Sequence, residues 1–122
     1  MKILNYETDQ RVPIGSHLKV LPADIVAFMG LVNYSEVYLA NGKKIIVATH
    51  LKILESRFFP HGFFRVHKSM IINTEYLLDK NPSTPSGLKL KNNLPVMASR
   101  RKFESFRSHN IQKYGIDMPV AG

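Results

Sequence analysis

The sequence of 122 residues contains no cysteine and no long uninterrupted run of apolar residues. The absence of cysteine excludes disulfide frameworks, thiolate zinc sites and cysteine nucleophiles. No segment approaches the roughly 18 consecutive apolar residues that a membrane-spanning helix needs, and the N-terminus lacks the apolar core of a signal peptide. The composition, with 44% hydrophobic and 21% charged residues, is typical of a globular domain. We therefore expect one cytoplasmic domain that has no membrane partner.

Signals for catalysis and for cofactor binding are also scarce. The five histidines are scattered along the chain, and no two have the i, i+4 spacing that places metal ligands on one helix face. No glycine-rich phosphate loop is present, because the seven glycines are dispersed among turns. His67 and Ser69 lie close together, but a nucleophilic serine also requires an orienting acid and an oxyanion site. We predict that the protein is not an enzyme and binds no metal or cofactor.

Acidic residues are few, and the excess of positive charge is confined to one part of the chain. Seventeen Lys and Arg residues against nine Asp and Glu residues give a net charge of +8. Residues 1–42 carry 3 basic and 4 acidic groups, whereas residues 43–122 carry 14 basic and 5 acidic groups. A basic region of this kind is typical of proteins that bind nucleic acid or an anionic surface, although it also serves solubility alone.

Short strand signals separated by turns fill most of the chain. The strongest is Asn41-Gly42, which is typical of a tight hairpin turn and lies between two apolar runs. Pro95 lies within a predicted strand, which indicates an edge or a bulge at that position. The other predicted strands flank Gly15-Ser16, span 63–66, 70–72 and 76–78, and form a second hairpin, 88–91 with 94–98, around Asn92-Asn93.

Two helices are predicted, near residues 50–58 and 100–112, because apolar residues recur on one helical face in each segment. Thr49 is the predicted N-cap of the first helix, and Ser99 is the predicted N-cap of the second. Many short strands with only two helices indicate a mainly β domain.

Residues 63–73, FFRVHKSMIIN, resemble the signature segment of the LytTR DNA-binding domain. The similarity covers about residues 12–108, which is nearly the whole chain. Several further motifs occur in the order and spacing of the family: Asp24-Ile25, Asn33-Tyr34, Asn41-Gly42 and Ala98-Ser99-Arg100-Arg101.

This resemblance implies an elongated arrangement of small antiparallel sheets with two short helices. It implies loops that enter successive major grooves of double-stranded DNA, and a role in bacterial transcription regulation. Members of the family typically bind paired repeat sites as two copies, and they commonly follow a receiver domain. A chain of 122 residues leaves no room for a receiver domain, and Met1 favours a one-domain regulator over a piece of a longer protein.

The same resemblance assigns base contacts to Asn33, Lys68 and Arg101. Arg101 offers the paired donors that match guanine O6 and N7. Lys68 cannot make the planar two-point contact of arginine, so contact with a base and contact with a phosphate both stay open for it.

Other residues near these three are predicted to contact the DNA backbone or to support the site, and each also has a structural interpretation. Ser69 and Ser99 are suited to phosphate oxygens, but Ser99 is equally suited to capping a helix. His67 fits a structural hydrogen-bonded role, Arg65 fits an ion pair, and Tyr34 fits the core. The full set of backbone or supporting residues is Tyr34, Arg65, His67, Ser69, Ser99, Arg100 and Lys102.

The predicted domain organisation is a flexible arm at residues 1–11, a LytTR-like domain at 12–112 and a C-terminal tail at 113–122. The alternative function is a basic module that binds an acidic protein or a membrane surface without reading bases. The ordered set of Asn33, Lys68 and Arg101 favours DNA binding over that alternative.

Overall fold

The structure, a computed structural model, describes residues 10–114. Within this range two sheets are formed, and the predicted mainly β class with two helices is confirmed. Residues 1–9 of the predicted arm and 115–122 of the predicted tail lie outside the described residues. The smaller sheet has two strands, β1 (Val12–Gly15) and β2 (Leu18–Val20). The larger sheet is antiparallel and has five strands in the order β5-β4-β3-β7-β6. Its strands are β3 (Ile25–Gly30), β4 (Ser35–Leu39), β5 (Lys44–Val47), β6 (Phe63–His67) and β7 (Met70–Asn73).

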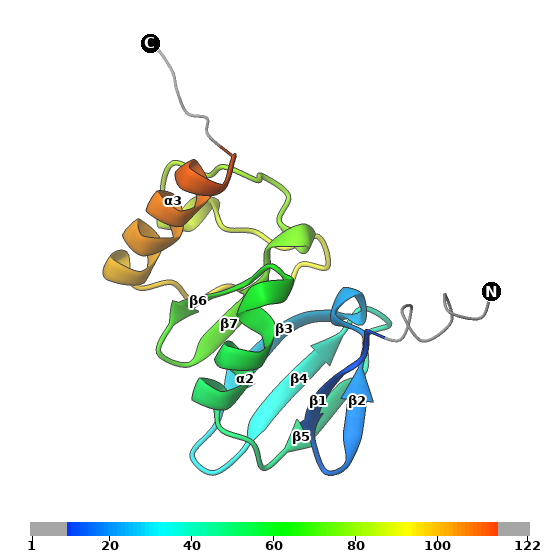
Figure 1. Ribbon diagram of the computed structural model, residues 1–122. Helices are drawn as coiled ribbons and strands as arrows, with labels where there is room; N and C mark the ends of the chain where they lie inside the picture. The colour runs from blue at the N-terminus through cyan, green and yellow to red at the C-terminus, as the bar shows by residue number, and fades with distance from the viewer. Residues whose placement is uncertain (1–9, 115–122) are drawn as a thin grey trace, which may run out of the picture.

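Two α-helices and four short 3-10 helices complete the described fold. The helix α2 (Leu51–Phe58) connects β5 to β6, and α3 (Arg100–Tyr114) follows the last strand after a long irregular segment (Figure 1). The 3-10 helices are η1 (Pro22–Asp24), η2 (Phe59–His61), η3 (Thr74–Tyr76) and η4 (Pro85–Gly87).

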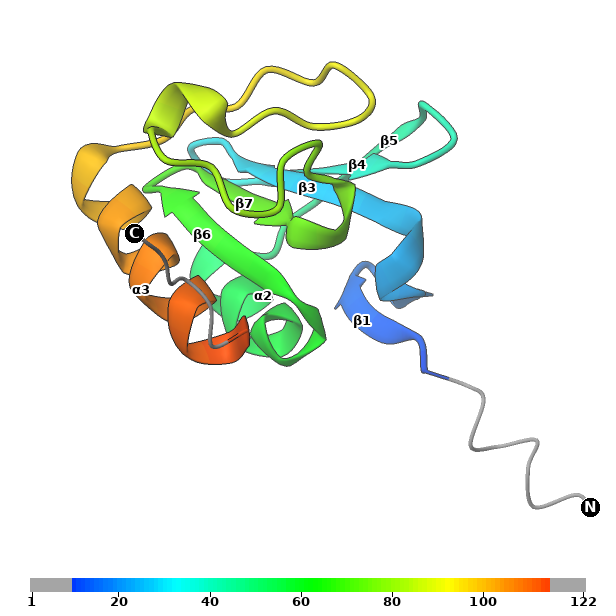
Figure 2. The ribbon, with the colours of Figure 1, turned by 90° about the horizontal axis from the view of Figure 1, so that it is seen from above.

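One face of the five-stranded sheet is covered across the strands, and the other is covered over β3, β7 and β6 (Figures 1 and 2). The side chains of α2 and β1 pack on one face, whereas those of α3 and the irregular segment pack on the other. The interior strand β7 shows why this requires an apolar run: Ile71 belongs to the first core, and its neighbours Met70 and Ile72 belong to the second. Successive residues of a strand point to opposite faces, so a strand covered on both sides must be apolar throughout.

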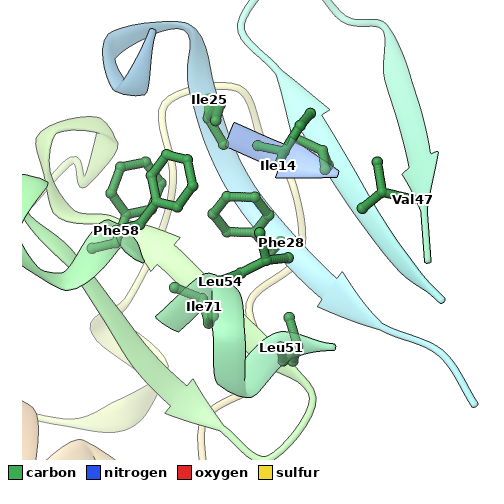
Figure 3. Packing of buried hydrophobic residues seen from close by; sticks show 10 residues of the cluster. Ile14, Ile25, Phe28, Val47, Leu51, Leu54, Phe58 and Ile71 are labelled. Carbon is green, nitrogen blue, oxygen red and sulfur yellow. The ribbon is translucent and has the colours of Figure 1, made fainter. Parts of the chain in front are cut away.

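The first core is built around aromatic rings from three elements (Figure 3). The ring centroid of Phe28 lies 4.9 Å from that of Phe58 and 5.6 Å from that of Phe63, and all three side chains are buried. Tilted and edge-on aromatic pairs at such distances stabilise a core beyond the area they bury. These contacts fix α2 against β3 and β6.

Two hairpin loops are important for the site. β3 and β4 pair up to Gly30 and Ser35, which leaves a four-residue loop at 31–34. β6 and β7 pair up to His67 and Met70, which leaves a two-residue turn at 68–69. The predicted Asn41-Gly42 hairpin is also confirmed, because β4 and β5 flank it.

The prediction that Thr49 caps the first helix is wrong. The N-cap of α2 is His50, and its side chain makes no capping hydrogen bond. Thr49 instead faces the β1–β2 hairpin, where its Oγ1 occupies the space in which a side chain at Gly15 would lie. Gly15 also has a φ of 121°, a conformation that residues with a Cβ rarely adopt. Thr49 therefore packs against Gly15 and does not cap the helix.

The predicted strand at 76–78 and the predicted hairpin of 88–91 with 94–98 are also wrong. Residues 74–76 form η3, and the only pairing in this region of the described chain is an isolated bridge between Leu77 and Leu90. A turn does form, but one residue earlier than predicted, at Lys91-Asn92, because Asn93 N donates to Leu90 O at 3.0 Å. Pro95 cannot donate to a ladder of hydrogen bonds, and Leu90 pairs with Leu77 rather than with the segment that contains Pro95.

Asn73 at the end of β7 is one of the few buried polar residues among those described. Its Nδ2 donates to the carbonyl oxygens of Ile25 at 2.9 Å and Pro22 at 3.3 Å. Its Oδ1 accepts from the backbone N–H of Glu75 at 3.0 Å. One side chain thus satisfies three backbone groups at the junction of η1, β3 and η3.

We predict that Asn73→Ala lowers the free energy of unfolding by about 1–3 kcal/mol, because it leaves buried backbone groups without partners. Chemical denaturation measures this loss. Asn92→Ala is the matched control, since Asn92 is exposed and accepts one hydrogen bond, from Leu94 N. An equal loss in the two variants would contradict the role given to Asn73.

Candidate nucleic-acid interface

The three segments that carry the predicted base-contacting residues lie along one side of the molecule. The β3–β4 loop holds Asn33, the β6–β7 turn holds Lys68, and the start of α3 holds Arg101. Down the left of Figure 1 come the start of α3, the β6–β7 turn and then the β3–β4 loop, and all three lie on the same side in Figure 2. The side chains of Asn33, Lys68 and Arg101 are all exposed.

Two backbone hydrogen bonds join these three segments. Gly30 N, at the end of β3, donates to Ser69 O in the β6–β7 turn at 2.8 Å. Ser99 N, just before α3, donates to Val66 O in β6 at 2.9 Å. The β6–β7 hairpin is therefore the central member, and both other segments are held against it.

Arg65 shapes the β6–β7 turn from within. Its Nη1 lies 3.0 Å from Glu55 Oε1 of α2, and the side chain is only 20% exposed. Its Nε and Nη2 donate to the carbonyl oxygens of His67 and Lys68. The period of two along β6 places Arg65 on the same face as Phe63, which is the face that α2 covers. Arg65 thus forms the structural ion pair that was one of its two interpretations.

His67 and Ser69 close the same turn. The backbone N–H of Ser69 donates to Nδ1 of His67 at 3.0 Å. The imidazole nitrogen that faces Ser69 is thereby an acceptor, and the ring has a structural partner. With its backbone held in this way, Lys68 projects from the turn as an exposed cation.

The β3–β4 loop is anchored at both of its ends. Leu31 N donates to Tyr34 O at 2.7 Å across the loop, and Ser35 Oγ donates to Thr49 O. Gly30 allows a close approach of α2, because a Cβ there would lie 2.9 Å from Cδ1 of Leu51 and would displace that side chain. Tyr34 is 52% exposed and so does not belong to the core.

The start of α3 presents several cations together. Ser99 is confirmed as the N-cap, because its Oγ accepts from Lys102 N at 3.2 Å. Arg100 and Arg101 are exposed, and Lys102 is half-buried. The N-terminus of a helix attracts anions through its free N–H groups and its dipole, so charge and backbone favour the same kind of ligand here.

An open groove of about 700 Å³ lies between the β3–β4 loop, the start of α2 and the β6–β7 turn. Its lining brings together Tyr34, Arg65, Lys68 and Ser69 of the predicted site. Asn33 is in the adjoining loop but not in the lining, and the predicted residues of 99–102 lie beyond the groove. No acidic residue is among the described residues that line it.

Several residues of the groove were not predicted from the sequence. His50 and Lys52 reach it from α2, and Val32 reaches it from the β3–β4 loop. No local pattern marks His50 or Lys52, because they enter the site only through the packing of α2 on the sheet. Glu55 lies in a helix that carries the family resemblance but was given no role in the site, although it pairs with the guanidinium of Arg65.

A separate cluster of charges lies on β4 and β5, outside the groove. The hydroxyl of Tyr38 donates to Glu36 Oε1 at 2.6 Å, and Lys44 Nζ lies 3.0 Å from Glu36 Oε2. The hydrogen bond to Glu36 and partial burial raise the pKa of Tyr38 to about 12. The hydrogen bond from Tyr38, together with Lys44, lowers the pKa of Glu36.

Residues 10–114 contain no group of three or more histidine or carboxylate side chains placed to hold a metal ion. In the same range, no helix has both the length and the apolar character needed to cross a membrane.

Comparisons with known proteins bear on the family and the fold. A family model described as the LytTr DNA-binding domain matches residues 15–110. Among solved structures, the chain is similar to the LytTr DNA-binding domain of a Bacillus cereus protein described as a methyl-accepting/DNA response regulator. The TM-score is 0.64 at 19% sequence identity, and the match covers 80% of this chain and 92% of that chain. At this identity the structural similarity shows the fold. No curated protein matches the chain.

The contacts of Arg65 generate a prediction about the β6–β7 turn. Arg65→Ala removes an ion pair and two hydrogen bonds to turn carbonyl groups, so we expect a loss of about 1–2 kcal/mol in unfolding free energy. We also expect faster hydrogen exchange at the amide of Gly30, whose acceptor lies in this turn.

Hydrogen exchange followed by NMR distinguishes this local effect from general destabilisation. Arg57→Ala is the matched control, because Arg57 is an exposed arginine that donates to Pro13 O, away from the turn. Unchanged exchange at Gly30 in Arg65→Ala would show that the turn does not depend on the guanidinium.

Proposed function

The chain belongs to the LytTr DNA-binding domain family, and we propose that it binds specific sequences of double-stranded DNA through successive major grooves. DNA binding in transcription regulation is the function of this family, which is not a family of enzymes. In the proposed mode the β3–β4 loop, the β6–β7 turn and the start of α3 enter the grooves. The observation that carries this proposal is the pair of backbone hydrogen bonds that joins these three segments along one side of the molecule.

Each segment supplies one side chain suited to a base edge. The guanidinium of Arg101 matches the two acceptors of guanine, and the amide of Asn33 matches N6 and N7 of adenine. The ammonium of Lys68 is a point donor, which suits a guanine oxygen or a phosphate. All three are exposed on segments whose backbones are fixed, so little backbone entropy is lost when they bind.

The residues around these three position the domain on the phosphate backbone. Arg100 and Lys102 supply charge at the start of α3, and the free amides of that helix end suit a phosphate oxygen. The hydroxyls of Tyr34, Ser69 and Ser99 are further candidate donors. Arg65 and His67 act through the turn that carries Lys68, because their polar atoms bind within it.

We further propose that two copies of the chain occupy paired repeat sites, as the family resemblance implies. The competing interpretation is a basic module that binds acidic surfaces without reading bases. That module needs only positive charge, whereas base reading needs particular donors at particular places. The predictions below separate the two interpretations.

We predict that the affinity for duplex DNA falls as the salt concentration rises. Four cations at the proposed interface are exposed: Lys52, Lys68, Arg100 and Arg101. With the half-buried Lys102 added and Arg101 assigned to a base, they imply about 4 phosphate contacts per copy and a log–log slope of affinity against salt of roughly −4. A fluorescence anisotropy titration of a labelled duplex at several salt concentrations measures this slope. Binding that is independent of salt would contradict the proposed contacts.

The second prediction separates base reading from charge at the start of α3. We expect Arg101→Ala to cost about 1–3 kcal/mol of discrimination at one base pair, because a paired contact to a base edge is lost. The adjacent Arg100→Ala removes the same charge, and we expect it to weaken all duplexes alike and to make the salt slope shallower by about one.

The measurement uses a site selected from a random duplex pool, its single-base variants and an unselected duplex. If Arg101→Ala weakens every duplex equally, then Arg101 contacts the backbone and the base-reading role is wrong. If selection yields no preferred sequence at all, the basic-module interpretation is favoured instead.

A further inference from the structure

Val32 at the tip of the β3–β4 loop is the most exposed of the large apolar residues described, with 91% of its surface accessible. Its loop neighbours Leu31 and Tyr34 are 49% and 52% exposed. A single exposed apolar residue is ordinary on a protein surface. Here, however, the residue adjoins Asn33 and lines the groove that also holds Arg65 and Lys68. The exposed apolar side chain is therefore part of a surface made for a polar, anionic partner.

The loop holds Val32 in a fixed position. A hydrogen bond of 2.7 Å crosses the loop from Leu31 to Tyr34, and one of 2.8 Å ties Gly30 to the β6–β7 turn. The branched side chain of valine is itself stiff at χ1. The two methyl groups of Val32 are thus presented outward with little freedom to lose on binding.

Duplex DNA offers few apolar groups to such a side chain. In the major groove the bases expose hydrogen-bond donors and acceptors together with the C5-methyl group of thymine. Contact between Val32 and a thymine methyl would remove apolar surface of both partners from water. A phosphate or a sugar edge would give no comparable gain.

We propose that Val32 is a specificity-determining residue that contacts the C5-methyl group of one thymine in the major groove. This inference rests on the proposed function, and it adds an apolar contact to the polar reading by Asn33 in the same loop. Removing one methyl group from an apolar contact changes affinity by about fourfold. Val32 therefore favours thymine over the otherwise equivalent uracil by that factor.

The experiment replaces each thymine of the selected site, one at a time, with deoxyuridine. This change deletes only the methyl group and leaves every hydrogen-bonding atom in place. For the unmodified chain we expect a loss of about fourfold in affinity at one thymine of each repeat. For Val32→Ala we expect the intact site to bind about as weakly as the uracil site, with no further loss on uracil substitution.

Ile46→Ala is the matched control, because Ile46 is an exposed, β-branched apolar residue of β5 that does not line the groove. It should retain the fourfold difference between thymine and uracil. Circular dichroism checks that each variant is folded, which is expected for Val32→Ala because an exposed side chain leaves no cavity.

Two results would overturn the inference about Val32. One is the absence of any thymine at which uracil weakens binding, and the other is a uracil effect that persists in Val32→Ala. If Arg101→Ala still reduces discrimination in either case, the proposed function stands and only the role of Val32 is wrong. If selection yields no preferred sequence, the proposed function fails and this inference fails with it.

Discussion

The arrangement of the candidate interface depends on the β6–β7 hairpin, because both other segments of that interface are hydrogen-bonded to it. Ser69 O accepts from the end of β3, and Val66 O accepts from the residue that precedes α3. Arg65 holds the β6–β7 turn through hydrogen bonds to its carbonyl oxygens, and Arg65 is itself paired with Glu55. A change in this hairpin would move all three segments relative to one another.

The hairpin is rigid because the sheet that contains it is packed on both faces. β7 is an interior strand that is buried along its whole length, with side chains in both cores. The helix α2 brings Glu55 to Arg65 from one side, and α3 brings Arg101 from the other. Groups that read DNA are most precise when fixed elements support the loops that carry them. Packing of α2 and α3 on the sheet therefore sets where the segments of the candidate interface lie.

Much of this fold could be predicted from local sequence patterns. Patterns only a few residues long predict the Asn41-Gly42 turn and the apolar faces of the two helices, and the structure confirms both. The strands predicted within 76–98 were wrong, because the apolar residues of this segment pack against α3 and the sheet without forming a ladder of hydrogen bonds. Apolar content predicts burial there, but it does not predict which backbone groups pair.

The candidate site was less predictable because it is assembled from segments far apart in the chain. The exposed Asn33, Lys68 and Arg101 were named through the family resemblance, and their positions on one side follow from tertiary packing. No local sequence pattern predicts that Lys52 and Glu55 lie beside the β6–β7 hairpin. A long-range ion pair such as Arg65–Glu55 emerges only when α2 and β6 are packed together.

The central claim is that these three connected segments enter successive major grooves on one face of the duplex. Dimethyl sulfate interference tests it most directly, because the methyl group is added to guanine N7 in the major groove. The account predicts that methylation blocks binding at guanines in clusters about 10 base pairs apart, one helical turn along the same face. Binding that is unaffected by N7 methylation throughout a selected site would contradict it.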